Sequence, residues 1–283
     1  MDRRPLALAA ALLSTACAGH RPATSAQSAP QAATPSVAVS RDPSSLRYAA
    51  GSARYRIEQS SRVVQDLMGQ SMTVDLGTRQ LVSAVATEAA GNLAVALTVD
   101  SVEVTGAPPG AEAPLIAMRG QTFRLVMAPS GLVVSVAAQD SANVLLLQAS
   151  NGLRDFFPQL PSVPAAGQTW TDTVSTTNAG EVSVTVLVIR EHRVIGWEDR
   201  DGVRALHVTS TSTYNVSGSG ETQGQALEMS GSGHSTRDSF VSASGFYLGS
   251  IESDSASMTA TLTAMGMTVP IRQSRRTTVS RLQ

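Results

Sequence analysis

Apolar and polar residues alternate with a period of two over most of the chain after residue 50. In the run "EVSVTVLVIRE" the apolar positions Val182, Val184, Val186 and Val188 fall on one face. In "RALHVTSTSTYNVSGSG" one face holds Leu206, Val208, Tyr214 and Val216, and the other holds His207 and a row of threonines. Alternation of this length is typical of antiparallel strands with one packed face and one wet face. The pattern predicts a mainly β protein.

Two of the predicted strands change phase. In residues 92–104 the apolar set runs to Val99 and then shifts to Val102, and in residues 258–269 it shifts between Leu262 and Met265. A β-bulge would absorb each shift and bend the strand. Bent long strands predict a strongly curved antiparallel sheet that resembles half a barrel. Turn signals at Ser130-Gly131, Asp201-Gly202 and Ser244-Gly245 predict hairpins between the strands.

One segment has the helical period instead. Ala142, Leu145, Ala149, Leu153 and Phe156 recur at helical spacing, Asp140 or Ser141 can cap the start, and Pro158 stops the helix. The pattern predicts one main helix over residues 141–157, with its apolar stripe on the concave side of the sheet. A candidate apolar pocket is then lined by Leu145, Leu153, Phe156 and Phe157. The alternative for these side chains is ordinary core packing, because only 4% of the residues are aromatic.

The helix and a proline-rich stretch, residues 140–167, join two strand-rich portions, 46–139 and 168–283. "LVMAPSGLVVSV" and "FVSASGFYLGSI" both predict a strand, a Ser-Gly turn and a strand. This echo predicts two related halves within one β-rich domain, residues 46–283. Ser-Gly hairpins are common, so an undivided domain is the alternative.

The first residues predict export. Arg3 and Arg4 precede an apolar run that is too short to span a bilayer, which is the layout of a signal peptide, here residues 1–16. The stretch Leu13 to Cys17 resembles the lipobox of bacterial lipoproteins, although Ser14 stands where that family prefers leucine. The resemblance implies a membrane anchor on Cys17, with an unlipidated signal peptide as the alternative. Cys17 is the single cysteine, so it has no partner for an internal disulfide.

The next residues, 17–45, are mainly Ala, Pro, Ser, Thr and Gln, and they predict a disordered linker behind the anchor. Position 18, directly after Cys17, is alanine. An aspartate at this position would resemble the signal that retains some bacterial lipoproteins at the inner membrane. We therefore expect a lipid-anchored protein of the cell envelope, at the outer membrane and facing the periplasm.

Composition and motifs exclude several functions. The 21 basic residues, all arginine, nearly balance 22 acidic residues, and no basic stripe predicts nucleic-acid binding. His192, His207 and His234 have no second ligand at a metal-binding spacing. The serines near His234, His234 itself and Asp238 lie too close together in one predicted strand to form a catalytic triad. We expect neither an enzyme nor a bound metal or cofactor.

The segment "FPQLPSVPAAGQTW" resembles a group of uncharacterised secreted bacterial proteins, in which a proline-rich run leads to a Gly-x-x-Trp, here Gly167 to Trp170. A lipidated curved sheet with a helix against it is more remotely similar to the periplasmic lipoprotein carriers. That resemblance implies a non-catalytic module that binds a lipid or another apolar ligand. The alternative is a structural or assembly protein that contacts another envelope protein.

Overall fold

The computed structural model describes residues 42–67, 69–108, 110–138, 146, 149–150, 152–178, 182–222 and 225–283. The predicted signal peptide, Cys17, most of the predicted linker and Leu145 lie outside these residues. The strands are β1 (Gly51–Leu67), β2 (Gln70–Ala89), β3 (Asn92–Thr105), β4 (Thr122–Met127), β5 (Val133–Ala138), β6 (Thr169–Asn178), β7 (Val182–Arg200), β8 (Val203–Thr222), β9 (Gln225–Ser242), β10 (Tyr247–Leu262) and β11 (Met267–Leu282).

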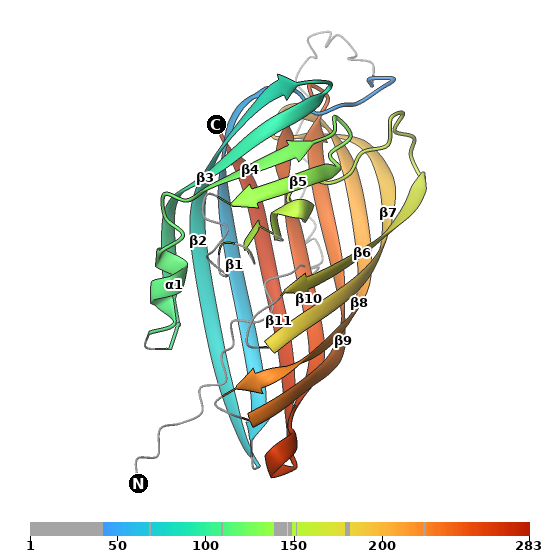
Figure 1. Cartoon of the computed structure of the whole chain (residues 1–283). Helices are drawn as coiled ribbons and strands as arrows, with labels where there is room; N and C mark the ends of the chain where they lie inside the picture. Colours follow the sequence, from blue (N-terminus) through green and yellow to red (C-terminus); the bar gives the residue numbers. More distant parts are fainter. Residues whose placement is uncertain are drawn as a thin grey trace, which may run out of the picture.

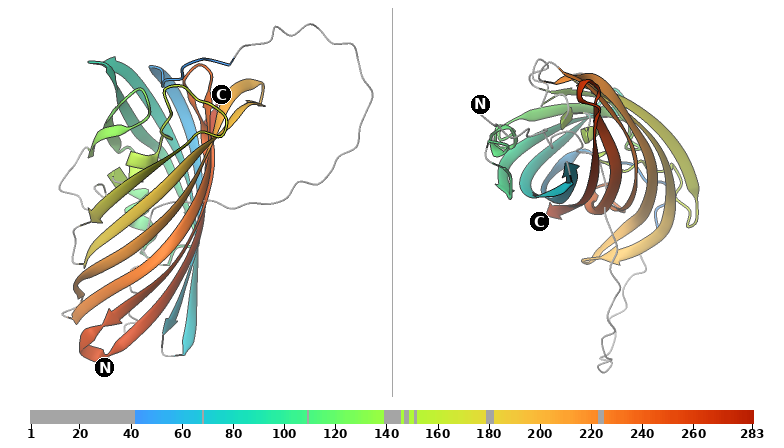
Figure 2. Two further views of the ribbon diagram at one scale, coloured as in Figure 1. Left: turned by 90° about the vertical axis from the view of Figure 1, so that its right-hand side faces the viewer. Right: turned by 90° about the horizontal axis from the view of Figure 1, so that it is seen from below.

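The eleven strands of the described residues belong to one antiparallel sheet, in the order β5-β4-β3-β2-β1-β11-β10-β9-β8-β7-β6. The strands β1 and β11 pair with each other near the middle, and β5 and β6 form the two edges (Figure 1). The sheet curls on itself without closing (Figure 2). The predicted mainly β, strongly curved antiparallel sheet is confirmed in this form.

The alternation of buried and exposed positions follows the sequence pattern. Leu206, Val208, Tyr214 and Val216 of β8 are all buried, as their shared phase predicts. The three predicted turns are present, and their glycines Gly131, Gly202 and Gly245 have positive φ angles of 91°, 77° and 83°. Side chains are costly in this region of φ, which is why glycine ends each turn.

The two predicted bulges have different outcomes. Leu81 pairs with Ser101 while Val82 pairs with Val99, so Asp100 is the extra residue of a bulge in β3. The second predicted bulge, between Leu262 and Met265, is wrong. Residues Thr263–Met265 form a 3-10 turn, η2, which with Gly266 closes the hairpin between β10 and β11. A tight turn reverses the strand direction and resets the phase, so it gives the same sequence signal.

The predicted main helix is largely outside the described residues. Leu146, Ala149, Ser150 and Gly152 have helical backbone, and Leu153–Asp155 form a 3-10 turn, η1. The helical turn therefore ends at Asp155, with Phe156 as its C-cap, slightly earlier than predicted. A short helix that was not predicted, α1 (Glu112–Ile116), follows β3 and buries none of its residues. Among the described helices, none is long and apolar enough to cross a membrane.

Candidate functional site

Residues 153–160, which we call the strap, lie against the concave face of the sheet. Phe156 and Phe157 are 8% and 7% exposed and belong to the main core. The Phe156 ring packs edge to face on Tyr55 of β1 and Tyr247 of β10, at centroid distances of 5.5 and 5.6 Å. The Phe157 ring packs on Tyr48 and Tyr247 at 5.6 and 5.7 Å. An aromatic lining, made by Tyr55 and Tyr247 of the sheet and Tyr48 of the segment before β1, thus receives two rings from the strap.

Charged and polar groups hold the strap in place. Arg190 of β7 donates two hydrogen bonds to the Asp155 carboxylate, at 3.0 and 2.9 Å. Arg237 of β9 donates to the carbonyl oxygens of Asp155 and Phe156. The Tyr48 hydroxyl donates to the carbonyl of Pro158 at 2.9 Å. No residue of the strap belongs to a strand. These contacts, the ring packing and the hydrogen bond from the Leu160 N–H to the Ser130 carbonyl, at 2.7 Å, attach it to the rest of the protein.

The structure describes three of the four candidate pocket residues. Phe156 and Phe157 lie together in the core, and Leu153 packs against it partly buried, whereas Leu145 lies outside the described residues. Beside Phe157, between Tyr48, Tyr55 and Tyr247, a cavity of about 30 Å³ remains. That volume is comparable to one water molecule. In this arrangement the strap fills the concave face where the pocket was predicted.

A second group of side chains forms an ionic cluster on the same face. The residues are Tyr214, Arg237, Glu252, Asp254 and Arg275. Burial raises the pKa of Glu252 to about 8, although the charge of Arg275 partly opposes this. Burial likewise raises the pKa of Asp254 to about 6, against the opposing charge of Arg275. Nε of Arg237 lies 3.5 Å from a Glu252 oxygen, so the cluster continues to the arginine that holds the strap.

A third cluster ties the edge strand β6 to β7 and β8. His192 Nδ1 lies 2.8 Å from Ser210 Oγ, and its Nε2 lies 3.5 Å from Asp172 Oδ1. Trp170 stacks on the His192 ring at 4.9 Å. The 3.5 Å between His192 Nε2 and Asp172 Oδ1 exceeds the length of an ordinary hydrogen bond, so this contact is mainly electrostatic.

The members of this third cluster are those of a Ser-His-Asp triad, but His192 and Ser210 are 3% and 4% exposed. The hydroxyl therefore has no access to a substrate in this arrangement. Burial disfavours ionised Asp172, but the contact with His192 and the charge of Arg190 outweigh it and lower the pKa of Asp172. An ionised carboxylate here strengthens the attachment of β6 to the sheet.

The histidine of β8 links strands and does not converge on a metal. The ring nitrogens of His207 lie 3.4 Å from Glu198 and 2.9 Å from Asp238, on opposite sides of the imidazole. The ring also packs on Phe240 at 4.6 Å. Among the residues that the structure describes, no group of three such side chains could hold a metal ion.

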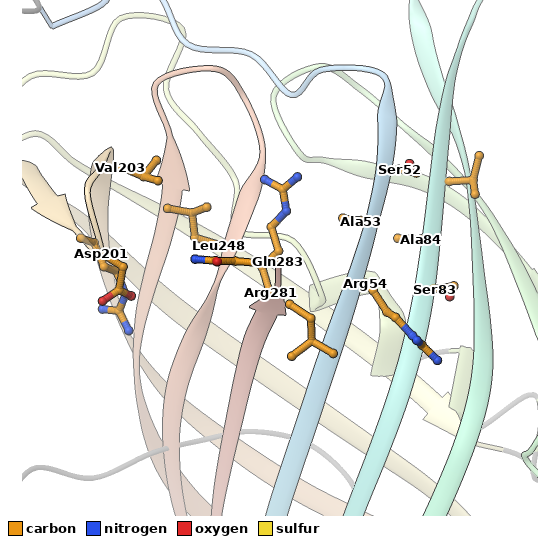
Figure 3. Close-up of a pocket in the computed structure, with 13 residues that line it drawn as sticks. Ser52, Ala53, Arg54, Ser83, Ala84, Asp201, Val203, Leu248, Arg281 and Gln283 are labelled. Carbon is orange, nitrogen blue, oxygen red and sulfur yellow. The ribbon is translucent and has the colours of Figure 1, made fainter.

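An open hollow of about 660 Å³ lies at one end of the sheet, between β1, β2 and the ends of β10 and β11 (Figure 3). Arg54 pairs with Asp100 at 3.0 Å, and the Arg281 guanidinium lies 4.6 Å above the Phe246 ring. Figure 3 shows that Arg54 and Arg281 extend in opposite directions. Arg200, which also lines the hollow, lies 3.7 Å above the Phe240 ring, so the three arginines have separate partners and do not form a joint site for an anion.

Sequence reasoning did not identify the strap contacts or the ionic cluster. Glu252 and Asp254 stand in phase with the buried apolar residues Met258, Ala260 and Leu262 of the same strand. Acidic residues at core positions were therefore a signal in the sequence. Arg190 carried the same kind of signal, in phase with buried Val184 and Val186 of β7. Arg237 did so too, in phase with buried Leu227 and Met229 of β9.

No protein-family model and no curated protein matches the chain. Solved structures that it resembles include a DUF1329 family protein from Desulfovibrio piger, with 9% identity, TM-score 0.18, and coverage of 81% of this chain and 84% of that one. Another is OccK2 (OpdF) of Pseudomonas aeruginosa, with 6% identity, TM-score 0.27, and coverage of 82% and 98%. A third is a domain from Vibrio parahaemolyticus named for outer-membrane lipoprotein sorting, with 11% identity, TM-score 0.16, and coverage of 81% and 83%. Such low TM-scores carry no argument about function, which has to be inferred from the chain's own geometry.

Proposed function

We propose that the protein is a non-catalytic binding protein of the cell envelope, anchored through Cys17, that holds a lipid or another apolar chain on the concave face of its sheet. The supporting observation is the aromatic lining formed by Tyr48, Tyr55 and Tyr247, which buries two rings from a segment that is not part of the sheet. An acyl chain offers the same apolar surface as these rings. It would occupy the place of Phe156 and Phe157.

The strap has to move aside for such a ligand to enter. Ligand pockets for small molecules usually measure about 300–1,000 Å³, far more than the cavity beside Phe157. Since the strap pairs with no strand, it can leave the concave face without breaking any ladder of the sheet. Arg190, Arg237 and Tyr48 would then lose their contacts with it, and the tyrosine rings would become accessible.

Photo-crosslinking in cells tests this proposal. Cells are grown on a fatty acid that carries a diazirine and an alkyne, irradiated, and the labelled peptides of the full chain are mapped. We expect label in the strap and in the facing parts of β1 and β10, besides any label on the N-terminal peptide. Phe157→Asp should lose the internal label, because it places a charge in the apolar site. Leu187→Asp, on an exposed position of β7, is the matched control and should keep it. Label confined to the N-terminal peptide in the unaltered chain would contradict lipid binding.

The alternative function is a structural or assembly protein without a small ligand. The observation that favours it is the close packing at the strap, where the rings fill the concave face and leave about 30 Å³. Under this alternative, no internal label appears and crosslinking between proteins in cells captures an envelope neighbour. Phe156→Ala would then act only on stability, with a cost of about 3–5 kcal/mol.

A further inference from the structure

The two edges of the sheet differ in how open they are to pairing. β5 has six residues and a register shift against β4. β6 has ten residues and pairs with β7 without a shift, from Thr169 opposite Arg193 to Asn178 opposite Val184. Natural edge strands are usually protected by shortness, bulges, prolines or charges, including charges that point inward. β5 has the first two protections. β6 contains no proline and no basic residue, and its one charge, Asp172, points inward to Arg190 and His192.

The free side of β6 presents peptide groups and hydroxyls together. The backbone N–H of Val194 donates to the carbonyl of Gln168, and the same register continues through Trp170 opposite His192. Because hydrogen-bonding residues alternate in an antiparallel ladder, the even-numbered residues of β6 bond to β7. The odd-numbered residues direct their peptide groups outward, and all five have exposed hydroxyl side chains, namely Thr169, Thr171, Thr173, Ser175 and Thr177. In the described part of the chain, no strand pairs with this side.

We propose that β6 is an interaction edge that pairs antiparallel with the same strand of a second copy of the chain, with the two-fold axis at Thr173. In this register Thr171 faces Ser175 of the partner subunit, which sets hydroxyl against hydroxyl. Asp172, the one charged residue of β6, faces Val174 of the partner subunit and not the partner's Asp172. Opposed hydroxyl pairs stabilise neighbouring strands, and like charges directly opposite each other destabilise them.

The symmetry of this contact limits its size. A strand that pairs with its own copy around a two-fold axis uses its edge completely, so the assembly closes as a dimer. Pairing of β6 with β5 of another copy would leave free edges and continue without end. The short, shifted β5 disfavours that arrangement. The inference does not depend on lipid binding, because β6 contributes no ring to the lining at the strap.

Sedimentation equilibrium of the full chain in density-matched detergent tests the proposal. We expect twice the mass of one mature chain, and we expect Thr173→Lys to weaken the dimer about tenfold or more, since it sets two cations opposite each other. Thr173→Glu should weaken it likewise, and an equal mixture of the two variants should restore it. Thr213→Lys, the same change on an exposed position of the inner strand β8, is the control.

Amide hydrogen exchange gives a second readout, because the odd-numbered amides of β6 should be protected in the dimer and exchange quickly in Thr173→Lys. If that variant fails to fold by circular dichroism, Thr171→Lys replaces it. A monomer at every soluble concentration overturns the proposal, as does a dimer that Thr173→Lys and Thr171→Lys leave intact. Capture of a different protein by β6 of a monomeric chain also overturns it.

Discussion

Tyr214 on β8 donates a hydrogen bond of 2.5 Å to Asp254 on β10, across the strand β9 that separates them. The residue beneath the tyrosine ring is Gly233, which pairs with Tyr214 in the ladder. A Cβ at that position would lie 2.3 Å from the hydroxyl of Tyr214. Because Gly233 of β9 has no side chain, Tyr214 of β8 can reach across β9 to Asp254 of β10.

Gly233→Ala should destabilise the fold by about 1–3 kcal/mol, the usual cost of overpacking. The added methyl forces the Tyr214 ring away from Asp254 and leaves the carboxylate with one neighbour fewer. Chemical denaturation measures the free energy of unfolding. Combining the change with Tyr214→Leu should remove the part of the cost that comes from the ring, and the part that comes from the Ser255 carbonyl, 2.7 Å from the same Cβ, should remain. A Gly233→Ala protein as stable as the parent would contradict this account of the crossing.

Stability should fall as the pH rises from about 4.5 to about 8. Folding raises the pKa values of Glu252 and Asp254, so the folded state holds protons that the unfolded state has released. The stability that these protons contribute is complete below the unfolded pKa and is lost as the pH passes the folded pKa. Each group contributes a slope of up to about 1.4 kcal/mol per pH unit.

Glu252→Gln keeps the shape of the protonated acid and should flatten this pH dependence above pH 6. Urea denaturation at several pH values measures it, with Glu228→Gln, at an exposed position of β9, as the control. Equal slopes for the parent and Glu252→Gln would show that burial does not raise the pKa of Glu252.

Asp155→Asn should loosen the strap. The change removes the charge that Arg190 binds through two hydrogen bonds, and such bonds to charged groups contribute about 1.5–3 kcal/mol. Arg154 is exposed within the strap, so trypsin can report on local opening. We expect cleavage after Arg154 to become about tenfold faster or more. Asp201→Asn, in an exposed turn, should leave the rate unchanged, and a similar rate in both variants would count against the role of Asp155.

Cys17→Ala should abolish membrane attachment. An alkyne fatty acid labels lipidated cysteine in cells, and fractionation reports where the chain resides. The parent is expected to carry label and to sediment with membranes, preferentially the outer membrane. A Cys17→Ala chain that keeps both properties would exclude this residue as the anchor.

The sequence predicted the sheet because each strand carries its own period, and burial of alternate residues follows directly from the chemistry of the side chains. The bulge beside Asp100 was predictable for the same reason. The phase change between Leu262 and Met265 could not be assigned from the sequence, because a hairpin turn and a bulge both shift the phase by one residue.

Contacts between distant residues could not be predicted from such local patterns. Nothing in the period of two indicates that Arg54 pairs with Leu282, or that Phe156 packs between β1 and β10. From the sequence, Phe156 and Phe157 were named as candidate pocket residues, and a pocket there stays a prediction. The contacts of Arg190 and Arg237 became visible only when the strands were placed side by side.

The pairing of β1 with β11 has a consequence for how the chain is made. These strands are separated by nearly the whole sequence, so the half-sheet built from β1 to β5 keeps an open inner edge until the last strand has been synthesised. Contacts of such long range slow folding and prolong the exposure of unpaired strands. A circularly permuted chain that starts at β6, runs through β11 into β1 and ends at β5 would contain only hairpins between neighbouring strands. Such a chain should reach the same sheet faster, and with less need of chaperones.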